Sequence, residues 1–167
     1  DGRWKAYLRQ GLNRLAATID TLYVTQLFHL KINPWEIRNK YIQVLLGQIT
    51  LDELAAKSCG RKLDSEQLGR LKILLEAQRY RLQMFMSCGW FFEDFSRIEP
   101  RNNVAYAARA VNLMQIATGI DLSAQVAADL RYVVSSSSGI RGDSVFMSQL
   151  IKAASTDYAS TPSLTAV

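Results

Sequence analysis

Apolar residues recur every three or four positions along most of the chain, which is the spacing of amphipathic helices. The first run begins at Trp4 and ends at Leu22 and predicts one long helix. The alternating patterns that are typical of strands are absent from the sequence, and no segment repeats with a period of 20–50 residues. The pattern therefore predicts an all-α fold, a bundle of six or seven helices.

Three of the predicted helices begin at a capping residue that is followed three positions later by Glu or Gln, the spacing of a capping box. The pairs are Asn33 with Glu36, Thr50 with Glu53, and Asp64 with Gln67. Pro34 occupies the first helical position after Asn33, where its missing N–H carries no penalty. Glycines end the first two of these helices, at Gly47 and Gly60. The third helix is predicted to continue to about Cys88.

The second half of the chain contains three further helical patterns and one loop. They are predicted as a helix from Pro100 to Gly119, a helix from Asp121 or Ser123 through Val134, a Ser/Gly loop over residues 135–142, and a last helix over residues 144–154. Small and polar residues follow. We therefore expect one helical domain over residues 1–155 and a disordered, flexible tail over residues 156–167.

Composition narrows the class of protein. A chain of 167 residues with 49% hydrophobic and 21% charged residues is long enough for one domain with a sizeable core. No apolar run reaches the length that spans a bilayer. The first residues contain neither an initiator Met nor a secretory apolar region, so we expect a fragment of a larger cytoplasmic protein. Cys59, Cys88 and the single His29 form no zinc-binding spacing, and neither a metal site nor a cofactor is predicted.

The net charge of +5 raises the question of nucleic acid. The basic residues are dispersed, which is typical of a solvated surface. Residues 50–63 resemble the first helix and turn of a helix-turn-helix, but the next helix begins Asp64-Ser65-Glu66, and these acidic groups would oppose phosphate. Nucleic-acid binding is therefore disfavoured. A free-standing helical module that binds protein or nucleic acid through its basic surface remains the alternative.

The predicted helix over residues 64–88 carries polar residues within its apolar stripes, among them Glu76, Gln78 and Arg79. Buried polar groups must be hydrogen-bonded, because leaving one unpaired costs about 1–3 kcal/mol. One interpretation is internal pairing, for example of Glu76 with Arg79 or Tyr80, with Arg81 lying along the surface. The other is a polar lining for a cleft shared with another domain.

Residues 87–92, Ser-Cys-Gly-Trp-Phe-Phe, are the most informative segment of the chain. A run of small residues lets the backbone approach another group closely, and the aromatics that follow offer flat faces to a core or to a ligand ring. One interpretation is a helix C-terminus with Gly89 in the left-handed conformation and the aromatics in the core. The other is a ligand-binding surface.

Several segments together resemble the helical C-terminal region of bacterial family-57 glycoside hydrolases of the α-amylase/α-mannosidase-like group, a region once described as a domain of unknown function. The segments are residues 33–42, 76–79, 84–94, 98–100 and 106–110. The match at residues 87–92 is the most specific of them.

The resemblance implies a parent enzyme whose barrel domain carries a carboxylate nucleophile and an acid/base for cleavage or transfer of α-glycosidic bonds. This chain lacks a His-Gly-Glu-like segment, so it would contribute no catalytic residue. It would pack on the catalytic barrel of the same parent chain and help to wall the cleft for an α-glucan or a related polysaccharide.

The resemblance also implies a set of cleft residues, with Trp90 as a sugar-stacking or wall residue. The substrate-cleft candidates are Ser87, Cys88, Trp90, Phe91, Glu93 and Asp94. The candidates for a polar cleft or a structural role are Glu76, Gln78 and Arg79. The chain departs from the family pattern in two places, because Gly89 stands where a carboxylate is common and Phe91 replaces Pro. Glu93 or Asp94 would then have to supply the carboxylate.

Overall fold

The computed structural model describes the backbone of residues 2–160 and the side chains of residues 2–156. Within that range lie seven helices of eight or more residues and one single-turn helix, α5. They are α1 (Arg3–Phe28), α2 (Pro34–Leu45), α3 (Leu51–Cys59), α4 (Ser65–Gln83), α5 (Cys88–Phe91), α6 (Ile98–Thr118), α7 (Ser123–Leu130) and α8 (Gly142–Ser160). The same range contains no strand, only an isolated antiparallel bridge between Val134 and Arg141. The all-α prediction is confirmed.

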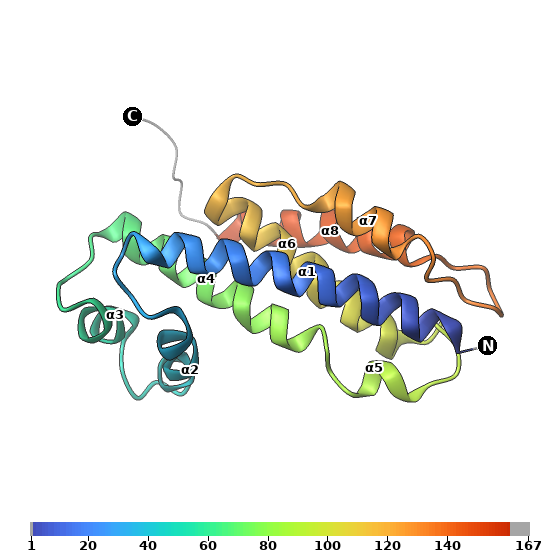
Figure 1. Cartoon of the computed structure of the whole chain (residues 1–167), viewed down its shortest axis with the longest axis horizontal. Coiled ribbons are helices and arrows are strands. Elements are labelled where there is room, and N and C mark those ends of the chain that lie inside the picture. The colour runs from blue at the N-terminus through green and yellow to red at the C-terminus, as the bar shows by residue number, and fades with distance from the viewer. Residues whose placement is uncertain (1, 161–167) are drawn as a thin grey trace.

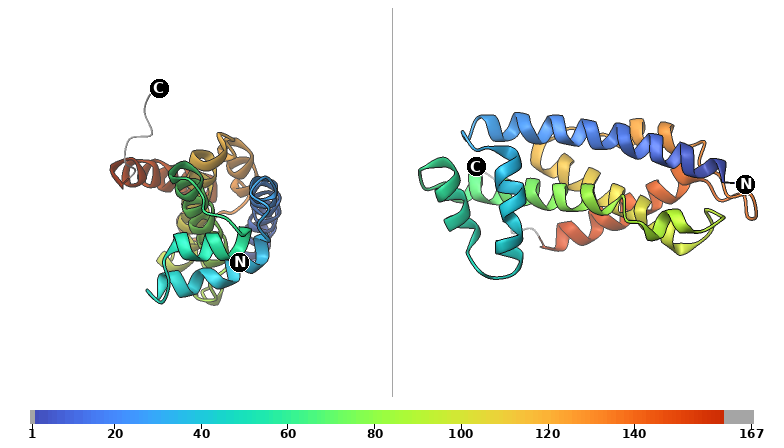
Figure 2. Two further views of the ribbon diagram at one scale, coloured as in Figure 1. Left: turned by 90° about the vertical axis from the view of Figure 1, so that its left-hand side faces the viewer. Right: turned by 60° about the horizontal axis from the view of Figure 1, so that its bottom comes forward.

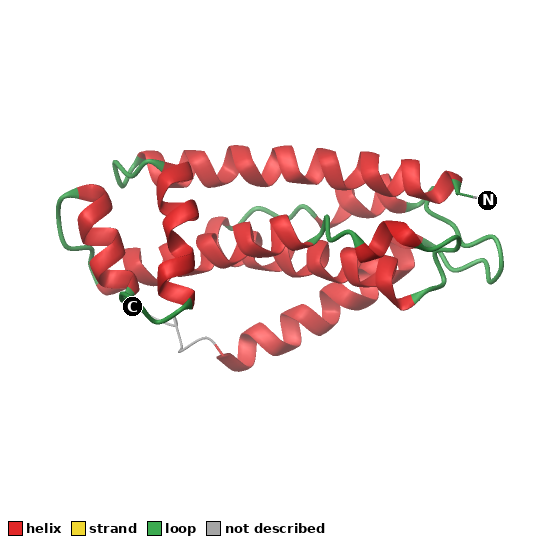
Figure 3. Ribbon diagram, turned by 90° about the horizontal axis from the view of Figure 1, so that it is seen from below, coloured by secondary structure: helices red, strands yellow, loops and turns green. Residues whose placement is uncertain are grey.

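The helices form an elongated bundle, with α1 and α4 side by side along its length, α7 next to α1, and α6 and α8 behind α1 and α4 (Figures 1 and 2). The short helices α2 and α3 cover one end, and α5 lies at the opposite end, where α1 begins (Figures 1 and 3). α6 is the central element and packs against α1, α4, α5 and α8. Its side chains are buried on most sides, and small alanines at positions 107, 108 and 110 let these neighbours approach.

The three helix starts predicted from a capping residue are correct, with one difference in their hydrogen bonds. Full capping boxes form at Thr50 and Asp64. Asn33 also caps its helix, since its side-chain oxygen accepts hydrogen bonds from the N–H groups of Trp35 and Glu36. The side chain of Glu36 does not return to Asn33, because it pairs with Lys40 one turn later, at 2.6 Å.

Several other predicted boundaries are wrong. α6 begins at Ile98 and α8 at Gly142, two residues before the predicted starts at Pro100 and residue 144. The helix expected over residues 64–88 ends at Gln83, since buried Met84 is the C-cap and the chain turns before α5. α7 ends at Leu130, short of Val134, because residues 133–142 fold back through the bridge between Val134 and Arg141. α8 extends past Ala154 to Ser160, into the segment predicted as a tail, whose residues 161–167 lie outside the described residues.

Candidate functional site

The segment around α5 is held at one end of the bundle by contacts with elements distant in sequence (Figure 1). The indole N–H of Trp4, on α1, donates to the backbone carbonyl of Glu93 at 3.0 Å. The hydroxyl of Ser135, in the loop between α7 and α8, donates to a carboxylate oxygen of Asp94 at 2.6 Å. The segment following α5 is therefore tied to both the first helix and the last loop.

Gly89 brings the backbone of α5 into direct contact with α6. A Cβ atom at this position would lie only 2.3 Å from Nδ2 of Asn103 and 2.5 Å from its Cγ. Nδ2 of buried Asn103 donates to the backbone carbonyl of Met86 at 3.1 Å. Gly89 is not one of the glycines with positive φ, so the prediction of a left-handed helix end is wrong. Close backbone approach is what this position requires.

The aromatic residues of the segment divide into a packed one and an exposed one. The guanidinium of Arg9, on α1, lies 4.4 Å from the ring centroid of half-buried Trp90 and 5.3 Å from that of Phe85. One face of the indole is thus covered by a cation instead of being open to a sugar. Phe91 is 82% exposed and packs edge-to-face on its neighbour Phe92.

Asp94 serves as an anchor for the Ser-rich loop. Its two carboxylate oxygens accept hydrogen bonds from the hydroxyls of Ser135, Ser136 and Ser137 and from three backbone N–H groups, those of residues 96, 136 and 137. Burial favours the neutral acid, but the hydrogen bonds led by those from Ser135 and Ser96 outweigh burial and lower the pKa of Asp94. This carboxylate is engaged in structure, whereas Ser87, Cys88 and Glu93 are exposed.

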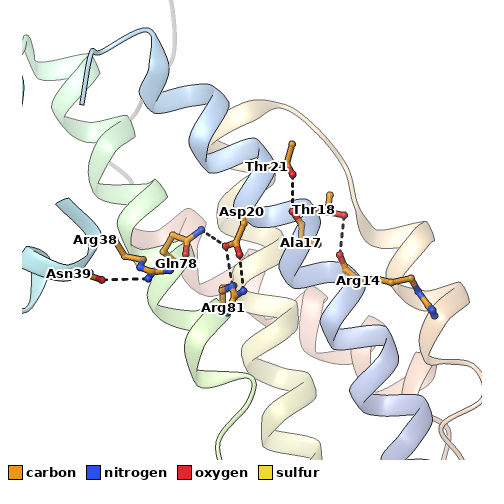
Figure 4. A network of polar contacts seen from close by, with 9 residues as sticks. All are labelled: Arg14, Ala17, Thr18, Asp20, Thr21, Arg38, Asn39, Gln78 and Arg81. Atoms are coloured by element: carbon orange, nitrogen blue, oxygen red, sulfur yellow. Dashed lines mark hydrogen bonds and ion pairs between the residues drawn. The ribbon is translucent and has the colours of Figure 1, made fainter. Parts of the chain in front are cut away.

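A shallow groove of about 370 Å³ runs between α1 and α4 beside this segment. Its lining combines two cations, one carboxylate, one amide, one aromatic ring and two small residues: Arg9, Asn13, Ala16, Ala17, Asp20, Arg81 and Phe85. Asp20 and Arg81 form a two-pronged ion pair across the groove, at 2.7 and 3.1 Å (Figure 4). Oδ1 of Asp20 also accepts a hydrogen bond from Nε2 of buried Gln78 at 3.1 Å.

Glu76 and Arg79 of α4 also pair within the domain. Nε of Arg79 donates to Glu76 at 3.0 Å, as the internal-pairing interpretation predicts. The hydroxyl of Tyr41, on α2, donates to the same carboxylate at 2.6 Å, and burial together with this bond raises the pKa of Tyr41. Arg81 instead pairs with Asp20 on α1, so the expectation that it lies along the surface is wrong.

The structure therefore brings only some of the sequence candidates together. Ser87, Cys88, Trp90, Phe91, Glu93 and Asp94 lie at the α5 end of the bundle. Of the three polar candidates on α4, Gln78 reaches the groove through Asp20, whereas Glu76 and Arg79 interact with each other, with α2 and with Tyr80. The polar candidates and the aromatic ones do not form a single cluster.

Arg9, Asn13 and Asp20 are groove residues that the sequence did not single out. Each lies on the polar side of a regular amphipathic helix, where charged and amide residues are ordinary. The one available signal is that each of them directly precedes or follows a buried position within the apolar stripe of α1. That signal identifies the groove only when it is known that α4 packs next to α1.

Replacing Asp20 with Asn tests how the groove is held. The amide oxygen can still accept from Gln78, but the ion pair with Arg81 is lost. We expect the free energy of unfolding to fall by about 1 kcal/mol, since the pair is only partly buried. Urea denaturation at low and high salt would check this, because added salt should narrow the gap between variant and wild type. An equal gap at both salt concentrations would contradict an ionic contribution.

The described residues show no group of three or more His, Cys, Asp or Glu that could hold a metal ion. Both cysteines are free thiols. Over the same part of the chain, no helix has the length and apolar character needed to cross a membrane.

Fold and site together define an all-α domain with an anchored aromatic turn at one end and a polar groove beside it. Residues 1–163 match the family described as a domain of unknown function, DUF3536, and the chain belongs to that family. No curated protein and no solved structure matches the chain.

Proposed function

We propose that the chain is the non-catalytic helical domain of a family-57-like glycoside hydrolase acting on α-glycosidic bonds. In this proposal the domain packs on the catalytic barrel of its parent chain, and its α5 end forms part of the wall of the substrate cleft. The proposal rests on the resemblance at residues 87–92 and on the solvent exposure of Phe91 within this segment.

The observation that carries the proposal is the exposure of Phe91. A phenyl ring that is 82% exposed is unfavourable in water, and here the backbone beneath it is fixed by Asn103 and Asp94. Earlier in the chain, Leu82 near the end of α4 and Met86 just after that helix are 50% and 44% exposed. Exposed apolar side chains close in sequence are typical of a surface that meets a ligand or another domain. Sugar rings stack on such aromatic faces.

In this proposal the residue that stacks on the sugar is Phe91 and not Trp90. The indole is half-buried and its face is occupied by Arg9, so in this proposal Trp90 supports the wall and positions the cation. Phe91, one residue later, presents the free ring. Asp94 is engaged by the serine loop, which leaves exposed Glu93 as the carboxylate available to a sugar hydroxyl.

Titration of the domain with short α-glucans, followed through indole N–H signals, tests the proposal. We expect saturable shifts at Trp90 and at Trp4, whose N–H contacts Glu93, and none at Trp35, which lies on α2 at the opposite end. Removing the ring with Phe91→Ala should weaken binding about five- to tenfold. Phe28→Ala is the matched control, because Phe28 is 78% exposed at the far end of α1. Equal losses in the two variants, or shifts at all three indoles, would contradict a site at α5.

A different surface favours the second candidate function, an interaction module for a polyanion such as nucleic acid. A hollow of about 430 Å³ between α6 and α8 has no acidic residue among the described residues of its lining, which are Ile98, Arg101, Asn102, Ser144, Val145, Ser148, Gln149 and Lys152. Steeply salt-dependent binding of a single-stranded oligonucleotide, unaffected by Phe91→Ala, would favour this function over the first.

A further inference from the structure

Arg9 is a cation whose position is fixed although it pairs with no carboxylate in the described part of the chain. Its guanidinium contacts the rings of both Phe85 and Trp90, at 5.3 and 4.4 Å from their centroids. Within the described residues it makes no hydrogen bond or ion pair, and it is exposed. Stacking holds a guanidinium through its faces, so the N–H groups around its edge stay available to a ligand.

The groove in which Arg9 lies has no other unbalanced charge. Asp20 is the one acidic residue of the lining, and both of its oxygens accept hydrogen bonds from Arg81. Asp20 and Arg81 therefore neutralise each other, and the charge of Arg9 sets the sign of the groove. Asn13 adds a neutral amide to the lining.

The chemistry that suits this arrangement is an oxyanion. A guanidinium presents a planar fork of donors that matches the two oxygens of a carboxylate or a phosphate. Ordering a free arginine side chain on binding costs conformational entropy, and part of that cost is already met here by the two rings. Ala16 and Ala17 are small, and a groove of about 370 Å³ falls within the range of small-ligand sites.

We propose that the groove between α1 and α4 binds an oxyanion carried on a sugar, such as a phosphorylated sugar or a uronic acid. The sugar part of this inference rests on the proposed function, whereas the oxyanion part rests on Arg9 alone. The groove would thus hold a phosphate or carboxylate group, in addition to the neutral α-glucan that the α5 end is proposed to bind.

The test compares the binding of glucose 1-phosphate, glucuronate and unmodified glucose by calorimetry and through the Trp90 signal. The two anionic probes should bind more tightly than glucose, and Arg9→Gln should weaken their binding about tenfold, the usual effect of losing a charged hydrogen bond. Arg131→Gln is the matched control, since Arg131 also stacks on an aromatic ring, that of Tyr132 at 4.6 Å, but lies outside the groove. The anion that binds more tightly shows whether the groove prefers a phosphate or a carboxylate group. Thermal melts of both variants verify that each remains folded.

The results separate this inference from the proposed function. If the two anions bind no better than glucose, or if Arg131→Gln weakens them as much as Arg9→Gln, the inference is overturned. The proposed function would still stand if neutral α-glucans bind in a manner that depends on Phe91. Conversely, anion binding that depends on Arg9, without any binding of neutral glucans, would support the oxyanion site and contradict the proposed function.

Discussion

Asp94→Ala should lower the free energy of unfolding by about 2–3 kcal/mol, because several hydrogen bonds to one partly buried carboxylate are lost together. The loss should be concentrated in the loop between α7 and α8. Its Ser136 and Ser137 donate both backbone and side-chain hydrogen bonds to Asp94. Amide hydrogen exchange should therefore accelerate in residues 135–138 well before it does in the central helix α6.

Urea denaturation of Asp94→Ala beside Glu93→Ala checks this value. Glu93 is the neighbouring carboxylate and is exposed, and the contact it makes with Trp4 uses its backbone carbonyl, which the substitution leaves in place. Glu93→Ala should therefore change stability little. Comparable losses in the two variants would show that the segment depends on its overall negative charge and not on the hydrogen bonds to Asp94.

The stabilisation from Asp94 should also depend on pH, in a direction fixed by its lowered pKa. A carboxyl group whose pKa is lower in the folded than in the unfolded state stabilises the fold fully above the unfolded value, near 3.9. That contribution is lost as the pH falls from this value toward the folded pKa. The gap in stability between wild type and Asp94→Ala should accordingly be constant near neutral pH and shrink below about pH 4.

Helix class and most helix starts were predictable because they depend on local chemistry. Thr50 and Asp64 form their capping boxes with residues only three positions away, and Gly60 and Gly119 end their helices through their own positive φ. The end of α4 was not predictable in this way. Its apolar pattern continues past Gln83, but the chain turns there and brings Gly89 of α5 against Asn103 on α6.

The candidate site was predictable in its motif but not in its partners. The composition of residues 87–92 distinguishes them within the sequence, and α5 and its flanking residues are formed by them. The partner of Trp90 is Arg9, eighty-one positions earlier in the chain, and that of Asp94 is the serine loop some forty positions later. Such contacts depend on how helices pack, which periodicity within one helix does not encode.

Gly89→Ala should lower the free energy of unfolding by about 1–3 kcal/mol, the usual range for overpacking a filled interior. The new methyl group would overlap the side-chain amide of Asn103, which is buried and bonded to the carbonyl of Met86. Either Asn103 moves and gives up that hydrogen bond, or α5 moves away from α6. In both cases Trp90 and Phe91 change position, so the variant should also lose whatever ligand the α5 end binds.

Gly69→Ala is the control, since Gly69 lies inside α4 with no atom within 4 Å of an added Cβ. Alanine there should be neutral or raise stability by up to about 1 kcal/mol, because it is the better helix former. Thermal melts of both variants, with the Trp4 and Trp90 indole signals as local probes, measure the two effects. If Gly89→Ala keeps wild-type stability and leaves both signals unmoved, α5 does not depend on its close approach to α6. The exposed position of Phe91 would then need another explanation. In the proposal its ring is preorganised for binding because the backbone beneath it is fixed.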